Sequence, residues 1–203
     1  MKKVIAVIGS MMLVASVASA QSWLDSFLKI ATEKVGDVLT GKSSGTAFDI
    51  KGSWKYQGVA IGASSDNALA SIAASAGSGT VENKLNELLA KAGIKAGAAT
   101  FNFKDDGSFT LLTGKINIPG TWTKEGDKLT LNFAKVITFK LVGTIKTTTE
   151  GCQILFDTGK FLDFVKKVLD AVGKLAGSNA TLSTVQQALA NVNELKLGFK
   201  LSK

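Results

Sequence analysis

The feature that most constrains the fold is an alternation of apolar and polar residues, which recurs in short segments along most of the chain. Successive side chains of a β-strand point to opposite faces, so this period of two is typical of strands with one buried face. The clearest example surrounds a polar turn at residues 105–107 and comprises Phe101, Phe103, Phe109 and Leu111. A three-residue turn keeps all four on one face. We therefore expect Phe103 to pair with Phe109, with Gly107 in the left-handed conformation.

Two further hairpins follow from the same alternation, with turns predicted at residues 125–126 and 150–151. The predicted cross-strand pairs are Trp122 with Leu129, Gly120 with Leu131, Ile118 with Phe133, Ile145 with Phe156 and Thr147 with Ile154. Apolar residues also alternate at 48–56 and at 195–201. Counting all such segments gives eight strands, a number that suits a small closed antiparallel barrel without unpaired edges.

Other segments have the spacing of amphipathic helices. They are residues 21–41, residues 66–94 as two short helices broken near Ser78, residues 160–176 and residues 181–192. The predicted fold is therefore mainly β with helical insertions, namely an eight-stranded antiparallel up-and-down barrel plus an N-terminal helix. Its predicted divisions are residues 21–45 for the helix and linker and residues 46–203 for the barrel, with insertions at about 66–94 and 160–192.

The N-terminus resembles a secretory signal peptide. Lys2 and Lys3 precede an apolar stretch at 4–17, and Ala-Ser-Ala at 18–20 fits the small-x-small cleavage pattern. The stretch is shorter than the ~20 residues of a membrane-spanning helix, which favours cleavage over an uncleaved anchor. We expect residues 1–20 to be removed, which leaves 203 − 20 = 183 residues. No lipoprotein cysteine follows the stretch, so the expected location is the periplasm or the exterior.

The composition removes several kinds of chemistry. All 24 basic residues are lysines, there is no histidine, and Cys152 is the single cysteine. The chain therefore offers no histidine base or metal ligand, no bidentate arginine clamp and no internal disulfide. Cys152 falls on an inward row, where a buried thiol behaves as a small apolar side chain. We expect no catalytic residues, no metal and no cofactor, and hence no enzyme.

Three local patterns imitate known sites. Residues 36–43 match the phosphate-binding pattern GxxxxGK[ST], but that loop needs a strand before it and a helix after it, the reverse of the order expected here. Asp105 and Asp106 lack the about six oxygen ligands of a calcium site, and the hairpin turn accounts for both. The lysines are scattered without an aromatic platform between them, so nucleic acid is not an expected partner.

A family resemblance appears when three motifs are taken in order. Gly-Ser-Trp at 52–54 resembles the lipocalin G-x-W, and it is followed by the patterned segments 101–109 (F-x-F-x-x-D-G-x-F) and 120–131 (G-T-W-x-x-x-G-x-x-L-x-L). From about Phe48 to its end the chain resembles the small exported lipocalin-like, calycin-type domains of Gram-negative bacteria, many of unknown function. The resemblance implies a non-catalytic cup that holds a small apolar molecule. It also implies a basic partner from the last strand for Trp54, and Lys200 is the candidate because the chain has no arginine.

The leading functional hypothesis is an exported monomeric module that binds a small hydrophobic ligand inside the barrel. The inward residues that would line it are Trp54, Tyr56, Phe101, Phe103, Phe109, Trp122, Leu131, Phe139, Phe156 and Phe199. The alternative is a packed structural or interaction protein of the cell envelope, without ligand, whose insertions plug the barrel. In either case the N-terminal helix is a candidate contact for an envelope protein or a membrane surface. An outer-membrane barrel is disfavoured by the lack of aromatic girdles and by short strands.

Overall fold

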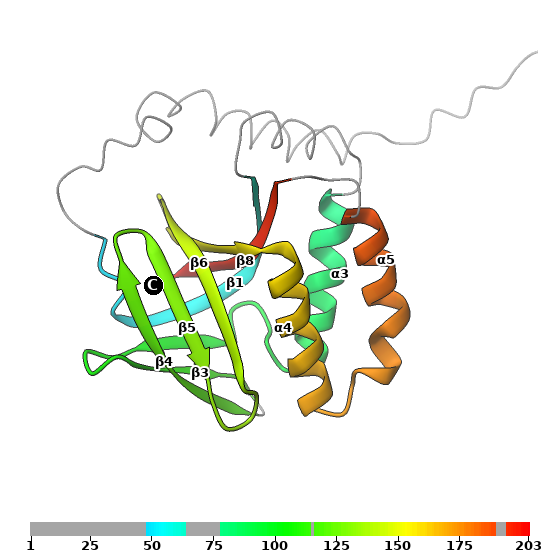
Figure 1. Cartoon of the computed structure of the whole chain (residues 1–203), viewed down its shortest axis with the longest axis horizontal. Helices are drawn as coiled ribbons and strands as arrows, with labels where there is room; N and C mark the ends of the chain where they lie inside the picture. The colour runs from blue at the N-terminus through cyan, green and yellow to red at the C-terminus, as the bar shows by residue number, and fades with distance from the viewer. Residues whose placement is uncertain (1–47, 64–77, 115, 190–193) are drawn as a thin grey trace, which may run out of the picture. The chain divides into compact units, whose positions relative to one another are not determined.

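The computed structural model describes residues 48–63, 78–114, 116–189 and 194–203. In these residues eight strands form a closed antiparallel barrel, in which each strand pairs with the next along the chain and the first pairs with the last (Figure 1). The strands are β1 Gly52–Ala63, β2 Thr100–Phe103, β3 Ser108–Leu112, β4 Asn117–Glu125, β5 Lys128–Phe133, β6 Phe139–Thr148, β7 Gly151–Asp157 and β8 Leu195–Ser202. The predicted eight-stranded up-and-down barrel is confirmed.

The helices lie in the two predicted insertions. Figure 1 shows them together on one side of the barrel. They are α3 Ser78–Lys91, α4 Thr158–Ala171, α5 Asn179–Leu189 and a 3₁₀ turn at Ala176–Ser178. α4 ends five residues earlier than predicted, because Gly173 adopts a φ of 66° and closes the last turn. The N-terminal helix, the phosphate-loop pattern and the first half of the 66–94 insertion lie outside the described residues.

The up-and-down topology defines two ends of the barrel. We call the base the end at which β1 begins and β8 finishes, and where the hairpins β2–β3, β4–β5 and β6–β7 turn. We call the mouth the opposite end, where β7 leads into α4 and where β3–β4 and β5–β6 are connected. The helices therefore enter and leave the barrel at its mouth, and the base is built from strands and tight turns.

The first predicted hairpin has the expected register. Phe103 pairs with Phe109, and Phe101 pairs with Leu111. Gly107 has a φ of 76°, the left-handed value that a three-residue turn needs and that glycine adopts without strain. The Asp106 carboxylate accepts a hydrogen bond of 2.8 Å from the backbone N–H of Ser108, which fixes the turn further.

The other two predicted hairpin registers are wrong by one turn residue. The β4–β5 turn lies at 126–127, so Trp122 pairs with Leu131, and the β6–β7 turn lies at 149–150, so Ile145 pairs with Ile154. Moving a two-residue turn by one position moves every pair by two, which leaves the same side chains facing inward. The alternation of apolar residues therefore does not distinguish the two registers.

β1 differs from its prediction in length and regularity. It begins at Gly52 rather than Phe48 and runs to Ala63, with a bulge at Gln57 in its pairing with β8. The bulge adds one residue to β1, so Tyr56 and Val59 both pair with apolar residues of β8. β1 is much longer than its neighbour β2, and the pairing between these two strands ends at Lys55.

Two glycines in the strands make room for aromatic rings inside the barrel. Gly120 lies between Phe109 and Phe133 on neighbouring strands, whose rings meet edge to face at a centroid distance of 5.1 Å. Gly143 lies opposite Phe156, and a Cβ there would approach its ring to 2.6 Å. The absence of a side chain at these positions lets the barrel interior close-pack around large residues.

Candidate functional site

The barrel interior is the candidate site, and it holds the residues predicted to line it. Trp122 and Phe139 are half-buried, at the base and the mouth respectively. The others are buried with at most 3% of their surface exposed, and they are Trp54, Tyr56, Phe101, Phe103, Phe109, Leu131, Phe156 and Phe199. The inward rows were therefore identified correctly, whereas their use in binding remains a prediction.

Phe199 lies at the centre of the aromatic cluster. Its ring centroid is 5.0 Å from that of Phe101 and 5.6 Å from that of Phe156, both on strands. It is also 5.9 Å from the Tyr56 ring. These separations are typical of favourable tilted and edge-to-face aromatic pairs. β8 therefore supplies the residue whose ring contacts the rings of the contiguous strands β7, β1 and β2.

α4 contributes two further rings at the mouth. Phe161 and Phe164 lie 5.2 Å and 5.7 Å from the Phe199 ring, and Phe164 lies 5.0 Å from the Phe133 ring. Both phenylalanines are fully buried. Both lie within the amphipathic helix predicted at residues 160–176, but neither is among the predicted site residues. The helical spacing of apolar residues in this segment was the sequence feature that could have identified them. Whether that apolar face enters the barrel depends on the path of the chain after β7.

Strand residues and the C-terminus close the base. The Trp54 indole N–H donates to the Ile50 carbonyl at 2.6 Å, and the Trp122 indole N–H donates to the Lys104 carbonyl at 3.1 Å. Lys203 holds its ammonium 5.0 Å from the centroid of the Trp54 ring. The polar edges of both indoles are thus satisfied while their apolar bodies seal the barrel.

The assignment of Lys200 as the basic partner of Trp54 is wrong. Lys200 forms an ion pair of 2.7 Å with Glu82 of α3, and the cation over the Trp54 ring is Lys203. Lys200 is paired with the bulged region of β1 and lies on a polar row of β8, whereas Trp54 points inward. Lys203 follows Ser202, the last paired residue of β8, and from this position its ammonium group reaches the indole.

A small polar cluster joins α3 to the barrel wall. The Asn86 side-chain oxygen accepts hydrogen bonds from the Tyr56 hydroxyl at 3.0 Å and from the Val59 backbone N–H at 2.9 Å. Burial raises the pKa of the Tyr56 hydroxyl well above its usual value, with a smaller contribution from the negative charge of Glu82. Tyr56 is therefore a neutral donor at any physiological pH, and the cluster fixes α3 beside the β1 bulge.

Cys152 is inside the barrel near the base. It is buried, and burial raises the pKa of its thiol to about 12. A thiol acts as a nucleophile in its thiolate form, which this environment disfavours. Cys152 therefore packs as a small apolar residue beside the aromatic cluster.

The described residues contain no group of three or more cysteine, aspartate or glutamate side chains placed to hold a metal ion. The acidic pair of the β2–β3 turn has local partners instead, since Asp105 pairs with Lys51 at 2.9 Å and Asp106 binds Ser108. Within the same ranges, no helix combines the length and apolar character required to cross a membrane.

Comparison with known proteins identifies the family. Residues 24–203 match the family described as "Lipocalin-like domain (DUF4923)". The comparisons with curated proteins and with solved structures gave no match. The match covers most of the chain and agrees with a closed eight-stranded barrel that carries Gly52-Ser53-Trp54 at its base. The chain therefore belongs to this family of lipocalin-like domains.

Proposed function

We propose that this protein is an exported, non-catalytic module that binds a small hydrophobic ligand inside its barrel, and that α4 closes the mouth of the barrel. One observation carries the proposal. The aromatic interior is closed at the base by the strands themselves, whereas at the mouth it is closed by Phe161 and Phe164 of a separate helix. A ligand that displaces these two side chains would exchange one apolar contact for another.

The chemistry of the interior supports an apolar ligand. The polar atoms of the inward-facing Trp54 and Trp122 are bonded to carbonyl groups, and the Tyr56 hydroxyl is bonded to Asn86. In the described residues, no buried side-chain nitrogen or oxygen is left without a hydrogen-bond partner. Recognition would therefore depend on shape and on the burial of apolar surface.

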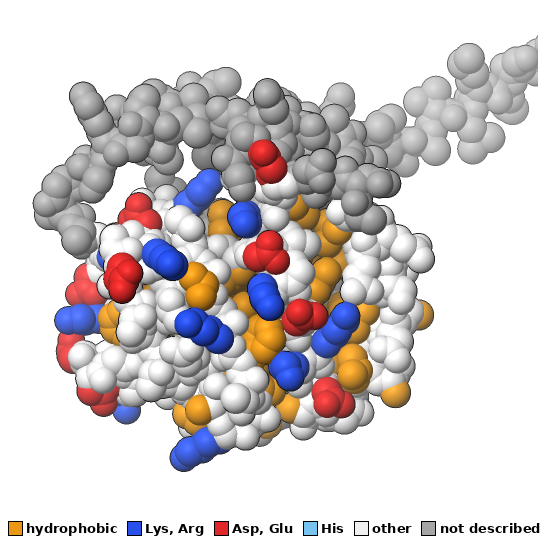
Figure 2. All heavy atoms as spheres, in the orientation of Figure 1, with side chains coloured by type: hydrophobic (Ala, Val, Ile, Leu, Met, Phe, Trp, Pro, Cys, Tyr) orange, Lys and Arg blue, Asp and Glu red, His pale blue; other side chains and the backbone are white. Residues whose placement is uncertain are grey.

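Export and the absence of catalysis are parts of the same proposal. Export is supported by the signal-like residues 1–20, and a protonated, buried Cys152 supports a binding rather than a catalytic role. Charged side chains of both signs spread over the face in Figure 2, while the barrel interior is apolar. We therefore favour a monomer in the periplasm or outside the cell, with residues 21–45 as a candidate contact for the envelope.

The second candidate is a packed envelope module without ligand. It is favoured by the ring contacts between α4 and the strands, at centroid distances of 5.0–5.7 Å for Phe164 with Phe133 and Phe199. Such contacts would hold α4 in place, and the barrel interior would then be a packed hydrophobic core that admits no ligand. The two candidate functions differ in whether α4 moves to admit a ligand into the barrel.

Native mass spectrometry of the protein purified from its own host tests the choice. A discrete excess mass that is lost on denaturation would support the binding module. The ligand-free protein should then show faster hydrogen exchange in α4 than the loaded protein, with base strands unchanged. A bare mass that stays unchanged after incubation with fatty acids, haem and sterols would overturn the binding proposal and favour the packed module.

A further inference from the structure

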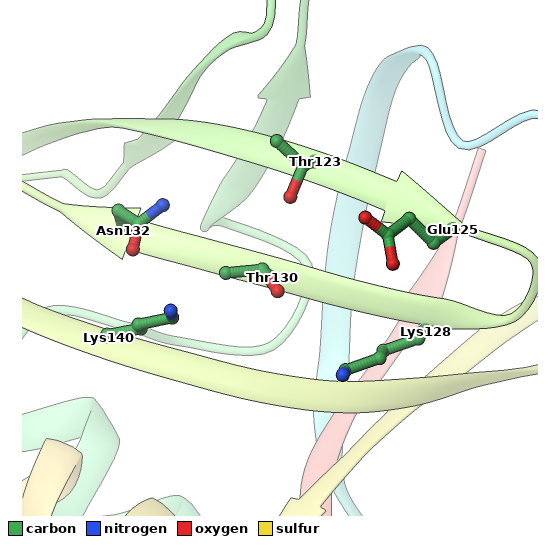
Figure 3. A pocket seen from close by; sticks show the side chains of 6 residues that line it. All are labelled: Thr123, Glu125, Lys128, Thr130, Asn132 and Lys140. Carbon is green, nitrogen blue, oxygen red and sulfur yellow. The ribbon is translucent and has the colours of Figure 1, made fainter.

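A polar groove lies on the outer face of the barrel, away from the apolar interior. It has a volume of about 270 Å³. Its lining residues come from β4, β5 and β6, and they are Thr123, Glu125, Lys128, Thr130, Asn132 and Lys140 (Figure 3). This volume is close to the lower end of the range of small-ligand pockets, ~300 Å³.

The sequence explains why the surface is hollow at this place. Thr123 and Thr130 are paired across β4 and β5 and form a short-side-chain floor. Long side chains stand around them, since Glu125 pairs with Lys128 on one side and Lys140 is on the neighbouring strand β6. Figure 3 shows that the polar ends of these longer side chains point toward Thr130 from two sides.

The groove has unused hydrogen-bonding capacity. Ion pairs among the described residues are Lys51 with Asp105 and Lys200 with Glu82, so neither groove lysine is neutralised within that part of the chain. Although Glu125 lies directly across from Lys128, the two do not form an ion pair. The side chains of the groove also make no hydrogen bond to any described residue.

We propose that this groove binds an acidic saccharide. The ammonium groups of Lys128 and Lys140 attract its carboxylate or sulfate group from two sides. The hydroxyls of Thr123 and Thr130 and the amide of Asn132 exchange hydrogen bonds with its hydroxyl groups, for which Glu125 is a further acceptor. This site is independent of the apolar ligand proposed for the interior.

The lining argues against other ligand classes. No apolar or aromatic side chain lines the groove, so a lipid chain would gain little by burial and a nucleobase would find no stacking surface. A ligand that is both anionic and rich in hydroxyl groups uses the ammonium, hydroxyl, amide and carboxylate groups together. An inorganic anion would use only the two lysines.

Titration of the full-length protein with tetragalacturonate, followed by amide chemical shifts at low salt, tests the proposal. Shifts should concentrate on β4, β5 and β6. The double variant K128Q/K140Q should weaken binding roughly fivefold to tenfold, because it removes both exposed ammonium groups that attract the carboxylate, each of which contributes only modestly. Its matched control is K146Q/K160Q, which removes the same charge at two exposed lysines outside the groove and should change binding less than twofold.

Two further ligands separate saccharide recognition from simple charge attraction. Maltotetraose, which is neutral, and sodium sulfate, which lacks the carbon framework and ring hydroxyls, should each bind at least tenfold more weakly than tetragalacturonate. Thr130→Val should weaken tetragalacturonate binding and leave the response to sulfate unchanged. Equal losses in both double variants, equal affinity for sulfate, or shifts spread over the whole surface would overturn the proposal.

Discussion

At its base the barrel is closed by residues of its own strands, whereas at its mouth it is closed by a helix inserted between β7 and β8. Trp54 and Trp122 at the base each donate a hydrogen bond to a carbonyl that lies nearby in the fold. The side chains of Phe161 and Phe164 at the mouth have no polar atoms and make ring contacts instead. We therefore expect that opening the base requires breaking the sheet, whereas opening the mouth requires only a movement of α4.

The attachment of α4 supports this difference. Asp157 caps the helix by accepting a bond from the Lys160 N–H at 3.2 Å, and the Thr158 hydroxyl donates to the Leu195 carbonyl at 2.7 Å. Otherwise α4 is held by apolar packing against α3, β6, β7 and β8, together with the Lys167 ammonium, which lies 5.9 Å from the centroid of the Phe139 ring of β6. Apolar packing is non-directional and can be exchanged for contacts with a ligand, which directional bonds resist. We therefore expect the base to be the more rigid end of the barrel and the mouth to be the end that adapts to a ligand.

The largest effect is expected from Phe199→Ala, because Phe199 contacts both the strands and α4. Removing a buried phenylalanine ring costs ~3–5 kcal/mol in the free energy of unfolding. Urea denaturation measures this loss, and hydrogen exchange should show base and mouth both weakened. Val142→Ala, at an exposed position on β6, is the control and should change stability by less than ~0.5 kcal/mol. A loss confined to α4 would contradict the central position of this ring.

Gly120→Ala should be the next most damaging change. A Cβ at this position would lie 2.5 Å from the Phe109 ring and would also meet the Asn132 carbonyl oxygen. The rings of Phe109 and Phe133 would have to separate, and overpacking of this kind costs ~1–3 kcal/mol. Gly114→Ala is the matched control, because no heavy atom lies within 4 Å of a Cβ there. Equal stability of the two variants in urea would show that the strands shift without cost.

Part of this architecture could be predicted from the sequence. The register of the hairpin that pairs Phe103 with Phe109 could be predicted, because only one turn length keeps its apolar residues on one face. The predicted site residues were found inside the barrel for the same reason, since inward rows follow from alternation alone. The turns at 126–127 and 149–150 were each predicted one residue away from these positions, because neighbouring registers bury the same residues.

Other features depend on contacts between distant segments. The bulge at Gln57 is a property of the pairing between β1 and β8, which are far apart along the chain. Phe161 and Phe164 lie within the helix predicted at residues 160–176, but the entry of their side chains into the barrel depends on the direction of the chain after Asp157. Which lysine contacts the Trp54 ring, Lys203 rather than Lys200, likewise depends on where the pairing of β8 ends.

Thr158→Val tests the mouth alone. It removes the hydrogen bond to the Leu195 carbonyl while keeping the shape of the side chain, at a cost of about 1 kcal/mol. Hydrogen exchange in α4 should rise, while alkylation of the buried Cys152 near the base stays as slow as in the parent protein. Thr184→Val, which loses an exposed hydrogen bond within α5, is the matched control. Faster alkylation of Cys152 in Thr158→Val would mean that the two ends open together.

The smallest effect is expected at the base, from Lys203→Met. The substitution keeps a flexible apolar stem near Trp54 but removes the ammonium that lies 5.0 Å from the ring centroid. Exposed cation–π contacts contribute ~0.5–1 kcal/mol, so the loss of unfolding free energy in urea should not exceed this range. Lys200→Met, which removes the ion pair with Glu82, separates a cation–π effect from a general loss of charge on β8. Because the Trp54 indole remains bonded to Ile50, exchange in α4 should be unchanged, and a faster exchange there would couple the base to the mouth through β8.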